Sequence, residues 1–220
     1  MELSHTHVVL RPIGSPLPLG MSGLAIGSFV ESGLALHWVP AGEIRQVGLI
    51  LLAVPFPMQL IACVLAYLAR DGTAGAALGV LASTWLAIGL VYVIVEPGQS
   101  SAPLGLMLLG SGGALSLSAV AASQSKRLTA FVFMVASARF MIAGVHELSG
   151  TALWQTVAGI LGLLLTAVAG YCVLAFELEG QHHRTVLPTF RANSGAAAIN
   201  DDFNAQVGEV EHEAGVRLTT

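Results

Sequence analysis

Six apolar runs, each close to the length of a membrane-spanning helix, constrain this 220-residue chain more than any other feature. The runs cover residues 18–39, 47–68, 74–95, 103–122, 128–145 and 153–176. A bilayer core about 30 Å thick is crossed by roughly 20 helical residues. We therefore predict an all-α membrane protein, built as a bundle of six transmembrane helices.

The scarcity of charge supports this prediction. Charged residues make up 10% of the chain and hydrophobic residues 55%, whereas about 25% of the residues of a soluble domain are charged. So few charges suit a surface that faces a lipid bilayer. The net charge is −4 and the basic residues are scattered, so a nucleic-acid partner is not expected.

The chain divides into one membrane domain with a segment on either side. We assign residues 1–17 to a cytoplasmic N-terminal segment, 18–176 to the transmembrane domain and 177–220 to a cytoplasmic C-terminal tail. The end of the tail is acidic, and we expect the tail to be largely disordered after about residue 192.

The orientation is predicted from the basic residues, which are enriched on the cytoplasmic side of membrane proteins. If the N-terminus is cytoplasmic, the inside carries Arg11, Arg70, Lys126, Arg127, Arg184, Arg191 and Arg217. The outside then carries Arg45 alone, and Arg139 falls within an apolar run. This asymmetry favours a multi-pass protein of the cell membrane, plasma or inner, with both termini in the cytoplasm.

The sequence contains no pattern typical of intramembrane catalysis. The apolar runs have neither H-E-x-x-H nor G-x-S-x-G, and no cysteine–histidine constellation. Cys63 and Cys172 both lie inside apolar runs, and their spacing suggests no metal site. We therefore predict a protein that is not an enzyme and that has no catalytic residue, metal or cofactor.

Two motifs at opposite ends of the membrane domain resemble those of one transporter family. Ser-Pro-Leu-Pro-Leu-Gly-Met at 15–21 is similar to the Asn-Pro-Ala-Pro-Leu-Gly-Leu signature of the acetate uptake transporters, also called succinate–acetate permeases. Arg-Thr-Val-Leu-Pro at 184–188 resembles the ending of that family, and the six-span plan between the motifs is similar. Ser15 replaces the signature asparagine and Ala66 an acidic residue, so the chain resembles a divergent member.

The resemblance implies uptake of acetate and related small carboxylates by a homo-oligomer, a hexamer with one pore in each protomer. Symport with protons and a channel-like pore both remain open. The substrate pathway that the resemblance implies consists of Pro18, Leu19, Gly20, Leu24, Gln59, Leu81, Trp85 and Ala136. Pro18 lies at the start of a predicted helix, whose dipole favours an approaching carboxylate.

The narrowest ring of that pathway differs from the resembled family. Where the family has Phe, Tyr and Leu, this chain has Leu24, Leu81 and Ala136. The exchange predicts an apolar and wider ring, and the width of such a ring limits which solutes pass. We expect acids larger than acetate, such as propionate, butyrate or succinate, to be tolerated unless neighbouring side chains refill the space.

Two further patterns concern the helices themselves. Pro-Leu-Gly recurs at 18–20 and 103–105, three runs apart, which suggests either a 3+3 inverted repeat like that of many transporters or chance. Pro-Phe-Pro at 55–57 interrupts the second run, because each proline removes a backbone hydrogen bond. This break is either a packing kink or part of the pore wall, with Gln59 just beyond it.

Glu31 and Arg139 are charges inside predicted helices, each costing roughly 3 kcal/mol at bilayer depth unless it is paired or hydrated. Glu31 lies 13 residues beyond Pro18, and Arg139 lies 12 beyond Arg127, in helices that run the same way. Both therefore lie about 18–20 Å from the cytoplasmic side. We predict an intramembrane ion pair, serving as a structural link or as a proton or anion relay. The resembled family has apolar residues at both positions.

Alternatives remain open for one site and for the function. His146 and Glu147, at the outer end of the fifth run, either cap a loop or couple transport to protons. A different class of function is a six-span membrane sensor or scaffold without transport activity, which would act through the acidic tail.

Overall fold

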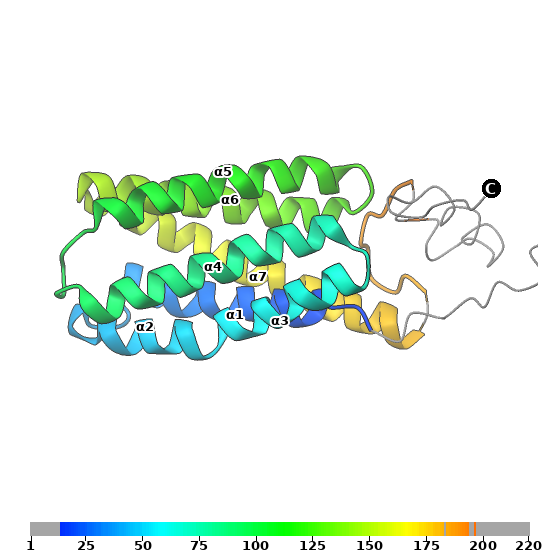
Figure 1. Ribbon diagram of the computed structural model, residues 1–220, viewed down its shortest axis with the longest axis horizontal. Coiled ribbons are helices and arrows are strands. Elements are labelled where there is room, and N and C mark those ends of the chain that lie inside the picture. The colour runs from blue at the N-terminus through cyan, green and yellow to red at the C-terminus, as the bar shows by residue number, and fades with distance from the viewer. Residues whose placement is uncertain (1–13, 183, 194–195, 197–220) are drawn as a thin grey trace, which may run out of the picture.

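The computed structural model describes residues 14–182, 184–193 and 196 (Figure 1). Its helices are α1 (Leu17–Ala35), the short 3-10 helix η1 (Ala41–Glu43), α2 (Ile44–Ala53), α3 (Pro55–Leu68), α4 (Gly72–Ile94), α5 (Ala102–Ser123), α6 (Arg127–Ser149) and α7 (Ala152–His182). An isolated backbone bridge joins Lys126 and Arg191. The predicted all-α architecture is confirmed for the described part of the chain.

The helices lie along one long axis, so the bundle has two ends (Figure 1). We call the end with the α4–α5 connection, residues 95–101, the loop end. The opposite end, where α7 finishes, is the tail end. The chain alternates between them: α1, α4 and α6 run toward the loop end, whereas α2 with α3, α5 and α7 run back.

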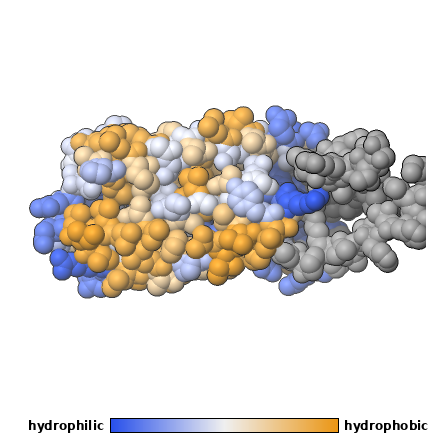
Figure 2. All heavy atoms as spheres, viewed as in Figure 1, coloured by the Kyte–Doolittle hydropathy of each residue, from blue (hydrophilic) through white to orange (hydrophobic). Residues whose placement is uncertain are grey.

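Five segments are long and apolar enough to cross a membrane, judged by length and composition. They are Ala41–Leu68, Gly72–Ile94, Ala102–Ser123, Arg127–Ser149 and Ala152–His182. Figure 2 shows apolar side chains over much of the visible side of the bundle and hydrophilic ones at the loop end. The chain is therefore a multi-pass membrane protein. α1 is not among the five segments, so the predicted count of six spans is not confirmed by these criteria.

The second predicted run is broken where the sequence analysis expects it. α2 ends at Ala53 and α3 begins at Pro55, and Val54 between them has φ −119° and ψ −74°. Gly23 and Gly27 of α1 face this break, since a Cβ added at either would lie 3.0–3.3 Å from atoms of Pro55. The break therefore also serves close packing between α1 and α3.

Two helices end away from the limits of the predicted runs. α1 stops at Ala35 rather than 39, because the chain turns at His37, where φ is 60°, and Trp38 N–H and Val39 N–H both donate to Gly33 O. α7 continues to His182, past the predicted limit at 176. Most of the predicted C-terminal tail lies outside the described residues, as do residues 1–13 of the predicted N-terminal segment.

The described part of the tail is tied to the tail end of the bundle. Tyr171 Oη donates to Pro188 O at 2.9 Å, which anchors the end of the Arg-Thr-Val-Leu-Pro motif on α7. The guanidinium of Arg191 pairs with the buried carboxylate of Glu179 and lies over the ring of Phe176. These contacts explain why α7 extends beyond its apolar run: its last turns hold a polar partner rather than lipid.

Candidate functional site

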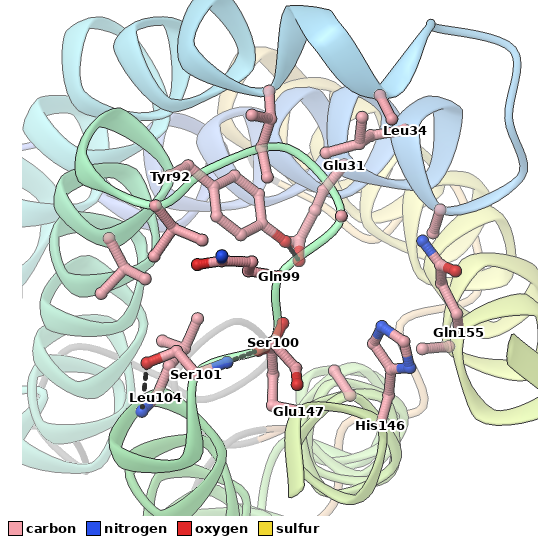
Figure 3. Close-up of a pocket in the computed structure, with 18 of the residues that line it drawn as sticks. Glu31, Leu34, Tyr92, Gln99, Ser100, Ser101, Leu104, His146, Glu147 and Gln155 are labelled. Atoms are coloured by element: carbon pink, nitrogen blue, oxygen red, sulfur yellow. Dashed lines mark hydrogen bonds between the residues drawn. The ribbon is translucent and has the colours of Figure 1, made fainter. Parts of the chain in front are cut away.

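A cavity of about 260 Å³ opens at the loop end. Its wall comes from the ends of α1, α4 and α6, the starts of α2, α5 and α7, and the α1–α2 and α4–α5 connections. Figure 3 shows Glu31 and Tyr92 on one side of the cavity, His146 and Glu147 on another, and Gln99 between them. Two carboxylates, one phenol, two side-chain amides and two serine hydroxyls thus come together from segments far apart in the sequence.

Glu31 and Arg139 are in direct contact at the wall of this cavity. Arg139 Nη2 lies 2.6 Å from Glu31 Oε2, and the residues are 2% and 6% exposed. The other oxygen of Glu31, Oε1, accepts a hydrogen bond from Tyr92 Oη at 3.4 Å. Since a lone buried charge costs several kcal/mol, each charge depends on the other.

The guanidinium of Arg139 is enclosed by aromatic rings. Its Cζ lies 5.6 Å from the centroid of Trp85 and 5.3 Å from that of Phe140, and these two rings meet edge to face. Nε and Nη1 have no hydrogen-bond acceptor among the described residues. A buried donor left without an acceptor costs about 1–3 kcal/mol, so this cation retains unused binding capacity.

Close approach of α7 to the guanidinium requires a glycine. A Cβ added at Gly162 would lie 2.8 Å from Arg139 Nε and would overlap the hydroxyl of Ser32. Ser32 Oγ meanwhile donates to Ser28 O at 2.6 Å. Any side chain at 162 would therefore displace the guanidinium of Arg139 and the hydroxyl of Ser32.

Glu147 and His146 occupy structural positions at the rim. Glu147 Oε2 accepts a hydrogen bond from Ser101 N–H at 2.6 Å, at the N-terminus of α5, where the helix dipole favours a carboxylate. His146 Nδ1 lies 3.1 Å from Thr151 O, beyond the end of α6. Both contacts fit the loop-capping interpretation, and a role in proton coupling stays a prediction.

None of the eight residues of the predicted substrate pathway lines the cavity; they lie closer to the tail end. Leu24, Leu81, Trp85 and Ala136 are fully buried in the apolar core. Gln59 is also fully buried, and its Nε2 donates to Gly20 O at 3.1 Å. Pro18 and Leu19 are half-buried at the start of α1. The interior of the bundle is thus closed between the cavity and the tail end.

Helical spacing places the predicted ring on the tail-end side of the charge pair. On α1, Leu24 precedes Glu31 by seven residues, two helical turns or about 10 Å. On α6, Ala136 lies one turn before Arg139. On α4, Leu81 lies one turn before Trp85, the residue beneath the guanidinium. Cavity, charge pair, aromatic rings and apolar ring therefore follow one another along the bundle.

Several cavity residues, among them Tyr92 and Gln99, were not predicted from the sequence. Tyr92 lies seven residues after Trp85, so helical spacing alone could have placed it on the same face of α4. Gln99 lies in a connection whose path no periodicity predicts. Among the described residues, no group of three or more His, Cys, Asp or Glu side chains could hold a metal ion.

Comparison with solved structures identifies the fold. The structure of the bacterial acetate channel SatP matches 80% of this chain and 99% of its own, with a TM-score of 0.72 and 21% sequence identity. The chain therefore has the fold of that channel, and the expected resemblance is confirmed at the level of the fold.

Comparison with curated sequences gives a second relative. The undecaprenyl-diphosphatase of Anaeromyxobacter sp. (strain K) is 30% identical over 204 residues, which cover 85% of this chain and 63% of that protein. The chain thus spans less than two thirds of that relative's length. No family model matches the sequence.

Proposed function

We propose that this protein carries acetate and related small carboxylates across a cell membrane, through the interior of each protomer. The observation that carries the proposal is the order of features along the bundle: a polar cavity, the Glu31–Arg139 pair and a buried apolar ring. A carboxylate needs such a route because lipid cannot replace its hydration. The fold shared with an acetate channel supports this proposal.

In this proposal α1 is a sixth span. Its 19 residues extend about 28 Å at 1.5 Å per residue, close to the thickness of the hydrocarbon core. Glu31 lowers its apolar character, but Arg139 compensates that charge inside the bundle. On its outer side Ile26 and Phe29 are 41% and 52% exposed, as expected for side chains that meet lipid or a second protomer.

The packing supports a 3+3 inverted repeat. In such a repeat α1 corresponds to α5, α3 to α6 and α4 to α7. The contacts match this correspondence: α1 packs against α3 and α7, and α5 packs against α6 and α4. The glycine of each Pro-Leu-Gly motif lies close to neighbouring helices: a Cβ added at Gly20 would overlap Leu78 of α4 and lie 3.3 Å from Ala62 of α3, and one added at Gly105 would lie 2.9 Å from Gly144 O of α6. Both motif glycines therefore lie at close helix contacts, although Gly20 is closest to α4 and Gly105 to α6.

Orientation, assembly and coupling complete the proposal. The loop end faces outward, and the tail end and both termini face the cytoplasm. The assembly is a homo-oligomer, with the hexamer as the expected form. Apolar side chains exposed on α5, such as Leu106 and Leu117, give surfaces for lipid or for a neighbouring copy. Proton symport and passive passage are the two modes that the experiment separates.

Uptake of labelled acetate into vesicles that contain the purified protein tests the proposal. We expect saturable uptake, inhibited by other small carboxylates and lost in Ala136→Phe, which fills the apolar ring. An inward proton gradient should accelerate uptake beyond its effect on protein-free vesicles for a symporter, and not for a channel. Uptake no faster than in protein-free vesicles, with folded protein present, would contradict the proposal.

The diphosphatase relative favours a second candidate, hydrolysis of a phosphate ester or diphosphate at the same cavity. Arg139, His37, His146 and two glutamates line that cavity, and such groups can bind and hydrolyse phosphates. The fold shared with an acetate channel favours transport over this candidate. Release of inorganic phosphate from a polyprenyl diphosphate by the purified protein would establish this activity.

The sensor or scaffold alternative is tested through the tail. Removing residues 195–220, almost all outside the described part of the chain, should leave acetate uptake intact if the protein is a transporter. A sensor or scaffold that acts through this segment should lose its output while showing no uptake in either form.

A further inference from the structure

We infer that the guanidinium of Arg139 is the carboxylate-binding group of the cavity, and that Glu31 is its resident substitute ligand, displaced when a solute carboxylate enters. The inference rests on the proposed function and adds a binding site to it. It assigns the charge pair a role in selection as well as in folding.

The unused donors of Arg139 are the first support. Glu31 contacts one nitrogen, Nη2, while Nη1 and Nε have no acceptor among the described residues. Guanidinium and carboxylate bind most strongly through two parallel hydrogen bonds. The contact in the structure is therefore an incomplete version of the pairing that a free carboxylate could make at Nη1 and Nη2.

The position of Glu31 is the second support. Its side chain lines the cavity, and Tyr92 Oη already donates to its other oxygen. When Glu31 leaves Nη2, it keeps the Tyr92 hydroxyl and gains water from the cavity. A volume of about 260 Å³ corresponds to roughly nine waters at about 30 Å³ each, enough for a small acid and part of its hydration shell.

The charges around the cavity leave Arg139 as the group that attracts an anion. It is the single Arg or Lys among the lining residues, all of which the structure describes. Glu147 is held by Ser101 N–H at the rim, and the remaining titratable groups are Tyr92, His37 and His146. Glu31 prevents Arg139 from trapping the solute, since it competes for the cation and returns to it after the solute leaves.

Rescue of stability by a free carboxylate tests the inference without measuring transport. Glu31→Ala removes the resident carboxylate and leaves space beside the guanidinium. We expect its melting temperature to be low, and acetate at ten times its Kd to raise it by about 4 °C. Acetate should raise the melting temperature of the wild type less, because Glu31 competes. Acetamide and chloride at the same concentration should not reproduce the effect.

Two further variants make the test specific. Glu31→Ala with Arg139→Leu should lose the response to acetate, because the cation is gone. Glu96→Ala removes a glutamate from the exposed pair with Arg45 at the same end, and should respond as the wild type does. An acetate response that is equal in the wild type, in Glu31→Ala and in the double variant would overturn the inference.

A fluorescence titration covers the case in which Glu31→Ala does not fold. With Trp38 and Trp154 replaced by Phe, the emission of Trp85 reports on the cation 5.6 Å from its ring. We expect saturable change on adding acetate, with the half-saturating concentration about tenfold lower in Glu31→Gln, since a neutral amide competes less well than a carboxylate. An equal or higher concentration in Glu31→Gln would contradict the inference.

The inference and the proposed function can fail separately. Acetate-specific stabilisation without uptake into vesicles would support the binding site and contradict the transport function. Saturable uptake with no acetate-specific effect on stability or on Trp85 emission would retain transport and remove Arg139 as its binding group.

Discussion

At the scale of single residues, the buried pair of Glu31 and Arg139 sets the energetics of the bundle interior. Each is almost fully buried, and their contact is 2.6 Å. Removing one partner leaves a charge that neither lipid nor the apolar core can solvate. Removing both leaves apolar volume that leucines can fill. The pair should therefore behave as a coupled unit in stability measurements.

We predict that Glu31→Gln and Arg139→Gln each destabilise the protein by about 3–5 kcal/mol, the cost of an uncompensated buried charge. Glu31→Leu together with Arg139→Leu should recover most of that loss. Denaturant unfolding in detergent micelles measures all three variants. If the double variant loses as much as the two single losses added together, the residues are not coupled.

The second prediction at this scale concerns selectivity. Leu24, Leu81 and Ala136 are fully buried, so neighbouring side chains leave no open space around the ring in this structure. We still expect its small side chains to yield to larger acids more readily than aromatic ones would. Leu81→Tyr with Ala136→Leu should lower the ratio of butyrate to acetate uptake. An unchanged ratio at normal expression would show that these residues do not determine selectivity.

At the scale of the helices, close approach depends on glycines that face neighbours. Gly162 of α7 meets Arg139 and Ser32, whereas a Cβ at Gly170, two turns later on the same helix, would meet nothing within 4 Å. The same contrast holds for Gly27, which meets Pro55 and Trp85. Two glycines of the same helix thus have different roles, because they lie on different sides of it.

The two glycines of α7 form a matched pair for mutation. Gly162→Ala should destabilise by about 1–3 kcal/mol, because the added methyl group overpacks against the charge pair. Gly170→Ala should be neutral or stabilise by up to about 1 kcal/mol, because alanine favours a helix more than glycine does. Thermal unfolding of the two variants measures the difference. Equal effects would show that α7 does not approach Arg139 as described.

At the scale of the whole molecule, the two ends differ in what they expose. The loop end holds the cavity, whereas the tail end is tied together by ion pairs between Lys126 and Asp71 and between Arg191 and Glu179. In the proposed orientation the cavity faces outward. An uptake protein would then meet its solute first at the cavity and release it past the apolar ring.

Single-cysteine labelling tests this orientation. With Cys63 and Cys172 replaced, a cysteine introduced at 98 in the α4–α5 connection should react with a membrane-impermeant maleimide in intact cells. A cysteine at 72, the first residue of α4 beside the α3–α4 connection at the tail end, should react only after permeabilisation. The reverse pattern would overturn the orientation, and labelling of neither position in permeabilised cells would show that the two connections do not reach the membrane surface.

The positions of the helices follow largely from the sequence alone, since they depend on local properties: apolar length and the two prolines that split α2 from α3. The ends of α1 and α7 do not, because a turn at His37 and the polar contacts of the tail decide them. The Glu31–Arg139 contact could also be predicted from the sequence, because opposite charges at equal depth in helices that run the same way can meet. The cavity, the unused donors of Arg139 and the contact of Gly162 with that cation were decided by the tertiary structure. Helices that are apolar on every side give no periodicity that tells which side faces inward, so their rotation about their own axes appears only once they are packed.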